Sequence, residues 1–182
     1  MALFARTAPA PAPVLVPAPE TWTPEGTLVS QRYRALEGAI VLVYTADTER
    51  GTAYYAAACL GCTYRADQNT GPNPMSEAEA AKAANAHATV CRTMPRGVPA
   101  RPEDPEAVEL VRSRLRRHRY STSPHPVHLA DFNALRVDLQ RSTHWIKTLL
   151  EFLVQAEPGF LTAAPTSDGQ GIRIMVQPFG RP

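Results

Sequence analysis

Cysteine and lysine are both scarce in this sequence of 182 residues, which has three cysteines and two lysines beside 17 arginines. An odd number of cysteines, two of them close together, argues against the disulfide framework of a small secreted protein. The net charge is +2, which is too mild to indicate a nucleic-acid partner by itself. The excess of arginine accompanies much alanine and proline, a bias typical of a GC-rich genome, so it carries little functional information.

Long apolar runs are also missing. The densest one, at 145–154, is interrupted by Lys147 and Glu151 and falls far short of the roughly 18 residues that suggest a membrane-spanning helix. Near the N-terminus, proline interrupts every apolar run, and the only early basic residue, Arg6, follows the apolar ALF, which is not the order of a secretory signal. We therefore expect a cytoplasmic protein with no membrane partner.

The common catalytic motifs are absent from the sequence. It contains neither the phosphate-binding G-x-x-x-x-G-K-[ST] loop nor the nucleophile elbow G-x-S-x-G. The zinc-deaminase signature H-x-E…P-C-x-x-C is absent too, because Ala88 and Thr89 follow His87 and the C-x-x-C precedes it. These absences favour a protein without a catalytic role.

Two hairpins are predicted from apolar and β-branched runs separated by turn residues. The first pairs residues 38–46 with 52–58, and the second pairs 159–164 with 172–177. Together with three helices, these four short strands predict an α+β fold in which short β-hairpins pack on the helices.

The three helices have recognisable start signals or apolar faces. Ser76 and Glu79 form a capping box before an alanine-rich helix at 77–93, and Asp104 with Pro105 opens a helix that extends to Tyr120. A long helix is predicted at 129–155 and carries the strongest helical periodicity in the chain. Its apolar face comprises Phe132, Leu135, Leu139, Ile146, Leu150 and Leu153.

All three cysteines belong to one pattern of candidate metal ligands, C-x2-C followed after 24 residues by H-x3-C. Cys59 and Cys62 are spaced so that two thiolates can bind one ion from a tight turn, and Gly61 gives that turn a permissive backbone. His87 and Cys91 are i and i+4 on a predicted helix and project from the same face. Small residues share that face: Ala80, Ala83 and Ala84. The pattern predicts a tetrahedral Zn²⁺ site.

The pattern resembles zinc fingers in which a hairpin knuckle supplies two cysteines and a helix supplies two ligands at i and i+4. The resemblance covers residues 59–91, about a fifth of the chain. It implies that Cys59 and Cys62 are the knuckle ligands, that His87 is the first helical ligand and that Cys91 stands in place of the last. The 24-residue spacer is about twice as long as that of the common ββα finger, which suggests a structural zinc ion that stabilises a larger domain.

Other interpretations of the cysteines are compatible with the sequence. A redox C-x-x-C pair normally precedes a helix, whereas loop-forming residues follow Cys62. An iron–sulfur cluster with one histidine ligand and three unliganded buried cysteines are further alternatives. A catalytic zinc ion is less compatible, because four protein ligands would leave no open coordination position.

Composition and the predicted zinc site together suggest one domain with a tail. Residues 1–28 are rich in proline and alanine and cannot bury enough surface to offset their ordering entropy, so we expect them to be extended or disordered, with Trp22 docked on the domain. Residues 29–182 are expected to form one zinc-stabilised domain. Its expected parts are a zinc module at 52–94, a proline-rich linker at 95–104, a helical part at 105–156 and a C-terminal hairpin at 159–178.

The segment RSRLRRHRY at 112–120 is the densest positive charge in the chain. Its candidate phosphate contacts are Arg112, Arg114, Arg116, Arg117 and Arg119. They spread around most of the helix, so the alternative is a solvated helix end whose arginines favour the C-terminal dipole. The predicted zinc helix is a poorer candidate, because Glu77 and Glu79 would repel phosphate. His118, His125 and His128 lie close by and are either exposed loop histidines or ligands of a second metal ion.

The first functional hypothesis is a non-catalytic zinc-binding protein that binds nucleic acid as a regulatory or accessory factor. The alternative is a protein-interaction adaptor or structural subunit in which zinc only stabilises the fold. In that case the side of the long helix with Trp145 and Phe152 would be a surface for a partner or a homodimer. A redox C-x-x-C protein is a third and less favoured hypothesis.

Overall fold

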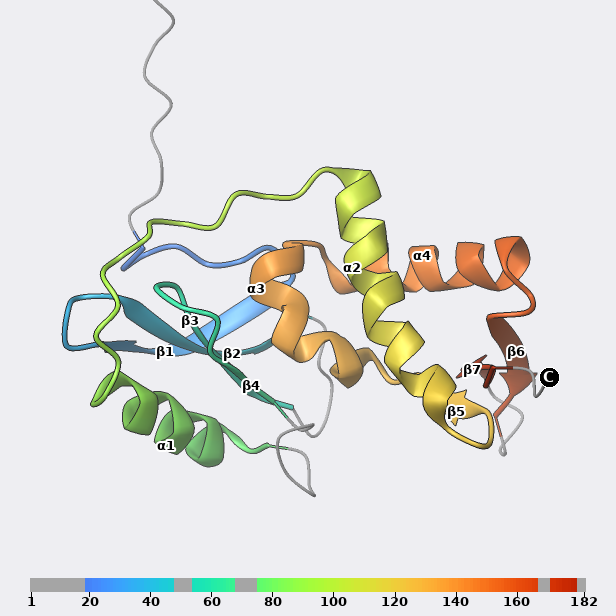
Figure 1. The fold of residues 1–182 in the computed structure, drawn as a ribbon, viewed down its shortest axis with the longest axis horizontal. Coiled ribbons are helices and arrows are strands. Elements are labelled where there is room, and N and C mark those ends of the chain that lie inside the picture. Colours follow the sequence, from blue (N-terminus) through green and yellow to red (C-terminus); the bar gives the residue numbers. More distant parts are fainter. Residues whose placement is uncertain (1–18, 48–53, 68–74, 167–170, 180–182) are drawn as a thin grey trace, which may run out of the picture.

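The computed structural model describes residues 19–47, 54–67, 75–166 and 171–179, and over that part of the chain it forms four α-helices and two antiparallel sheets (Figure 1). In chain order the elements are β1 (Thr27–Arg34), β2 (Ile40–Ala46), β3 (Ala56–Cys59), β4 (Arg65–Ala66), α1 (Glu77–Ala88), α2 (Asp104–Arg116), the 3-10 helix η2 (Arg117–Tyr120), β5 (His125–Pro126), the 3-10 helix η3 (Leu129–Leu135), α3 (Arg136–Leu139), α4 (Thr143–Ala156), β6 (Leu161–Pro165) and β7 (Ile172–Val176). The predicted α+β class is confirmed.

The first sheet has the strand order β1–β2–β3–β4, and β2 is buried along its whole length. The expected hairpin is present, because β2 and β3 pair antiparallel. Strand β1 was not predicted from the sequence. It lies at the edge of the sheet, and its residues alternate between more and less buried positions, with arginines at the exposed ones. A half-polar edge strand of this kind has little apolar signal. Trp22 packs against the domain, as predicted.

Helix α1 covers one face of this sheet (Figure 1). Its contact face is made of alanines, because Ala80, Ala84 and Ala88 are buried against the strands. The predicted capping box is formed by the side chains and backbone of Ser76 and Glu79. Alanine at these positions lets the helix lie close to the strands, where a larger side chain would hold it away.

Helix α1 is shorter than predicted, because it ends at Ala88 and not at 93. The β-branched residues Thr89 and Val90 follow, and both have low helix propensity. The hydroxyl of Thr89 donates to the carbonyl oxygen of Ala86, which competes with continuation of the helix.

The opposite face of the sheet packs against η3 and α3. Leu42 and Tyr44 are fully buried there, in a cluster that includes Val137 of α3. The hydroxyl of Tyr44 donates to the carbonyl oxygen of Asn133 at 2.9 Å, and the side-chain amide of Asn133 donates to the carbonyl oxygen of Tyr54 at 2.8 Å. These bonds join the sheet to the helical part of the chain.

The predicted long helix at 129–155 is wrong as a single helix. The structure forms η3, then the short α3, and then a separate α4. Gln140 ends α3 in a left-handed conformation with φ of 46°, and Ser142 caps α4 by accepting from the backbone N–H of Trp145. The apolar periodicity crosses the break because most of the predicted face, from Phe132 to Leu153, enters one shared core on both sides of it.

That core forms the second part of the structure. It is built from α2, η3, α4 and the second sheet, whose strand order is β5–β7–β6 (Figure 1). The predicted C-terminal hairpin is confirmed, because β6 and β7 pair antiparallel. The predicted helix from Asp104 to Tyr120 is α2 continued by η2. Among the described residues, no helix is both long and apolar enough to cross a membrane.

The alanine face of α1 leads to a prediction about packing. Ala84 is fully buried, so Ala84→Leu should lower the free energy of unfolding by about 1–3 kcal/mol through overpacking against the sheet. Ala86→Leu on the exposed face of the same helix is the matched control and should change stability by no more than about 0.5 kcal/mol. Urea denaturation of both variants measures the difference, and equal losses would contradict this packing.

Candidate metal centre

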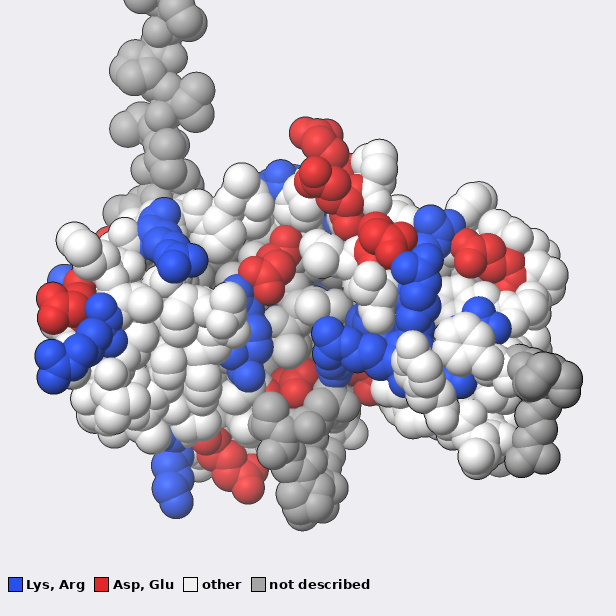
Figure 2. Space-filling model, in the orientation of Figure 1, with Lys and Arg blue, Asp and Glu red and all other residues white. Residues whose placement is uncertain are grey.

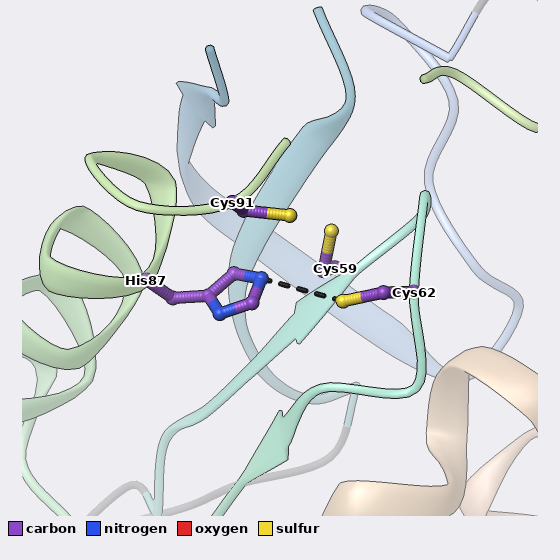
Figure 3. Close-up of side chains that lie close together, drawn as sticks. All are labelled: Cys59, Cys62, His87 and Cys91. Atoms are coloured by element: carbon purple, nitrogen blue, oxygen red, sulfur yellow. Dashed lines mark hydrogen bonds between the residues drawn. The ribbon is translucent and has the colours of Figure 1, made fainter. Parts of the chain in front are cut away.

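The three cysteines and His87 converge between the first sheet and α1 (Figure 3). Cys59 is the last residue of β3, Cys62 lies in the turn between β3 and β4, and His87 is in the last turn of α1. Their ligand atoms, with that of Cys91, all lie within 4.8 Å of one another. The Sγ atom of Cys62 and Nε2 of His87 are 3.4 Å apart. The sequence pattern therefore describes one cluster in space.

The donor set and its spacing fit a single tetrahedral metal ion. With metal–sulfur distances near 2.3 Å and metal–nitrogen distances near 2.0–2.1 Å, tetrahedral donors are about 3.6–3.8 Å apart. The separation of 3.4 Å between Sγ of Cys62 and Nε2 of His87 is close to those values, and no two of the four ligand atoms are more than 4.8 Å apart. All three cysteines are free thiols, Cys59 and Cys91 are buried, and Cys62 and His87 are half-buried. Thiolates with one imidazole are ligands that zinc and iron sites use.

Cys91 reaches the cluster in a different way from the one predicted. It was expected on the helix, at i+4 from His87, but it lies three residues beyond the last residue of α1 (Figure 3). Its backbone N–H still donates to the carbonyl oxygen of His87 at 2.9 Å, which is the bond that a helix would make. The i, i+4 relation therefore survives in the local backbone even though the regular helix has ended.

Residues 59–64, which form the turn between β3 and β4 and are called the knuckle below, donate backbone hydrogen bonds to the sulfur atoms of their own cysteines. The N–H of Gly61 lies 3.3 Å from Sγ of Cys59, and the N–H of Tyr64 lies 3.5 Å from Sγ of Cys62. Such donors stabilise the thiolate form, which is the form that binds a metal ion. The turn is closed by the N–H of Cys59, which donates to the carbonyl oxygen of Tyr64 at 3.1 Å.

Two further contacts orient the other ligands. The ring of Tyr64 stacks on that of His87 with centroids 3.9 Å apart, and its hydroxyl donates to the carbonyl oxygen of Ala83 in α1. Sγ of Cys91 and the hydroxyl oxygen of Thr93 are 2.8 Å apart. Contacts of this kind fix the rotamers of ligands and tune their basicity.

Arg65 ties the knuckle to the helical part of the chain. One guanidinium nitrogen donates to the carbonyl oxygens of Cys59, Cys62 and Tyr64 at 3.0, 3.3 and 2.8 Å. The Nε and Nη2 atoms donate to the two carboxylate oxygens of Asp138 in α3 at 3.1 and 2.6 Å. This two-point ion pair fixes orientation as well as distance. The roles of Tyr64, Thr93 and Arg65 could not be predicted from the sequence, because they depend on chain segments that meet only in the fold.

The environment shifts the pKa values of three of the four ligands. Burial raises the pKa of Cys59 to about 11, against the opposing effect of the backbone donors. Burial also acts to raise the pKa of Cys91, but its hydrogen bonds with Thr93, Cys59 and Cys62 together outweigh burial, and the pKa is lowered. Burial lowers the pKa of His87, so its imidazole is neutral near pH 7 and can act as a ligand. Because Cys59 is protonated near that pH without a metal ion, metal binding must release its proton.

Most of the arginine cluster makes contacts within the protein. Arg112 pairs with Glu157, and Arg114 donates to the carbonyl oxygen of Asp131 at 2.8 Å and lies 3.6 Å from the carboxylate of Asp67. These two arginines hold α2 against neighbouring segments.

The remaining arginines lie near the C-terminal end of α2. The guanidinium of Arg119 is 4.2 Å from the ring centroid of Phe179, Arg116 is exposed and pairs with Glu109, and Arg117 is exposed. Figure 2 shows basic side chains gathered along α2, with acidic ones toward its N-terminal end. The five candidates are thus close in space, but only Arg116 and Arg117 are exposed to solvent.

The knuckle leads to a prediction about Gly61. A Cβ atom there would lie 2.5 Å from the Cβ of Ala39 and 2.7 Å from the hydroxyl oxygen of Thr93. Gly61→Ala should therefore lower the free energy of unfolding by about 1–3 kcal/mol and weaken metal binding. Gly159→Ala is the control, because nothing lies within 4 Å of the added atom. Chemical denaturation with and without a chelator measures both effects, and equal behaviour of the two variants would refute the close approach.

Comparison with known proteins adds no assignment to this centre. No family model matches the chain, and neither a curated protein nor a solved structure matches it at a significant level. The interpretation of the centre rests on its own geometry and chemistry.

Proposed function

We propose that the four ligands bind one structural Zn²⁺ ion and that the protein is a non-catalytic module that binds nucleic acid. The convergence of three thiols and one imidazole from the β3–β4 knuckle and the end of α1 carries the zinc assignment. Four protein ligands complete a tetrahedral shell and leave no position for substrate or water, which is the arrangement of structural zinc sites. The ion would hold the end of α1 against the first sheet.

The exposed end of α2 supports the nucleic-acid part of the proposal. Arg116 and Arg117 face solvent there and can approach phosphates. Tyr120 is 81% exposed and Phe179 is 50% exposed, and their rings meet with centroids 5.3 Å apart. Exposed aromatic rings beside arginines favour stacking with unpaired bases, so single-stranded nucleic acid is the preferred ligand.

A protein partner is the second candidate. Phe152 on the outer side of α4 is 61% exposed, as the adaptor hypothesis requires. Trp145, which that hypothesis placed on the same surface, is instead partly buried, and the guanidinium of Arg141 lies 5.5 Å from its ring centroid. A surface with one large exposed apolar side chain is a weaker candidate than the arginine and aromatic surface at the end of α2.

The zinc assignment predicts about one zinc ion per chain in the purified protein. Structural zinc contributes about 10–16 kcal/mol in zinc-finger peptides, which is comparable to the whole stability of a typical domain. Cys62→Ser should therefore lose the ion and the cooperative unfolding transition. Thr63→Ser, at the exposed neighbouring position, should keep both. Elemental analysis and thermal unfolding measure the two effects, and a folded wild type without metal would refute the assignment.

The nucleic-acid proposal predicts salt-dependent binding to a single-stranded oligonucleotide. Replacing both Arg116 and Arg117 by glutamine should weaken binding and reduce the slope of log K against log salt by about 1.4, since each lost phosphate contact accounts for about 0.7 on single strands. The control replaces Arg34 and Arg101 by glutamine. Both are also exposed, so this double variant loses the same amount of positive charge.

Fluorescence anisotropy at several salt concentrations measures these slopes. Equal slopes for the two double variants would argue against a specific role for the end of α2. If the wild type fails to bind even at low salt, the nucleic-acid proposal is wrong. Phe152→Ser, compared with the wild type by sedimentation, then tests the protein-partner candidate.

A further inference from the structure

A second group of metal-ligand side chains lies in the other part of the structure. His118 comes from η2, His125 from β5 and Asp131 from η3, and one ligand atom of each lies within 4.8 Å of the others. The two imidazole rings stack in parallel, with their centroids 4.1 Å apart and an angle of 4° between their planes. Three segments that are separate in the chain therefore bring two nitrogens and one carboxylate oxygen together.

The third member of the group is Asp131 and not His128, which the sequence suggested. The side chain of His128 is exposed, but its backbone N–H donates to Oδ2 of Asp131 at 2.8 Å. Asp131 is buried, with 5% of its surface exposed. The hydrogen bond orients the carboxylate, as second contacts commonly do for metal ligands.

His118 has a buried ring nitrogen without a hydrogen-bond partner in the described part of the chain, and the stacking of the two rings does not satisfy that nitrogen. Its Nε2 atom is hidden from solvent and has no hydrogen-bond partner among the described residues. A buried nitrogen without a partner is unfavourable, and a bound metal ion would satisfy it. Burial and, to a smaller extent, His125 lower the pKa of His118, while the carboxylate of Asp131 acts to raise it and Arg114 and Arg117 act to lower it.

We propose that His118, His125 and Asp131 form a second metal site, which binds a borderline divalent cation such as Zn²⁺, Co²⁺ or Ni²⁺. Two imidazoles and one carboxylate are a common ligand set for such ions. Donor atoms around an ion with bonds of 2.0–2.2 Å are about 3.0–3.5 Å apart, so the side chains must rotate and the two parallel rings must tilt until both imidazole lone pairs point at the ion. Three protein ligands leave at least one coordination position open.

This site differs in chemistry from the cysteine centre. It contains no thiol, and the positive charges of Arg114 and Arg117 oppose a cation there while Asp131 favours one. We therefore expect weaker binding than at the cysteine centre, and loss of the ion during purification. The inference does not depend on nucleic-acid binding or on the identity of the first ion.

Cobalt titration tests the second site directly. Tag-free protein with the cysteine centre loaded with zinc is titrated with Co²⁺, and binding is followed by visible absorption and competition with a chelating dye. The wild type should bind one further Co²⁺ per chain, with the weak absorption of a nitrogen- and oxygen-bound ion and no sulfur-to-cobalt charge transfer. Failure to bind this additional ion would overturn the proposal.

Matched variants identify the ligands. His118→Ala and His125→Ala should each weaken the additional binding by about 100-fold or more, since losing even an outer partner of a metal ligand costs about 10–100-fold. His144→Gln is the control, because His144 is an exposed histidine outside the group, and it should leave binding unchanged. Unchanged affinity in both alanine variants would also overturn the proposal.

A measurement on the wild type covers the case in which the alanine variants do not fold. Co²⁺ is paramagnetic, so its binding should broaden the ring proton signals of His118 and His125 in the NMR spectrum and leave those of His144 sharp. Broadening of His144 with sharp His118 and His125 signals would place the ion elsewhere and contradict the proposed site.

Discussion

The meeting of three thiols and one imidazole between a strand turn and a helix end is the constraint on which the first half of the structure depends. Cys59 and Cys62 come from the turn between β3 and β4, and His87 and Cys91 come from the end of α1 and the residues that follow it. The alanine face of α1 allows this close approach to the sheet. Arg65 extends the same constraint to α3 by binding knuckle carbonyls on one side and Asp138 on the other.

Arginine side chains also join several segments within the helical part of the chain. Arg136 is fully buried and donates to the carbonyl oxygen of Arg141 and to the hydroxyl of Thr143. Arg141 in turn binds the carbonyl oxygen of Pro102 and the carboxylate of Asp104, which fixes the start of α2. The planar guanidinium can make several directed bonds at once. An arginine-rich sequence therefore need not indicate a nucleic-acid surface, and only the exposed Arg116 and Arg117 at the C-terminal end of α2 support that interpretation.

The sequence predicted the features that depend on local spacing. The C-x2-C turn, the capping box at Ser76 and both predicted hairpins are present because neighbouring residues determine them. The sequence did not predict the features that depend on contacts between residues far apart in the chain. The break at Gln140 interrupts an unbroken apolar period, and β1 is a strand because β2 pairs with it. Asp131 joins His118 and His125 through a tertiary approach that sequence spacing does not reveal.

X-ray absorption at the zinc edge of the purified protein tests the central claim most directly. A structural Zn²⁺ ion bound by Cys59, Cys62, His87 and Cys91 predicts a dominant shell of three sulfur atoms near 2.3 Å and one nitrogen near 2.0–2.1 Å. A shell of nitrogen and oxygen atoms alone, or protein that folds without any zinc, would contradict the account.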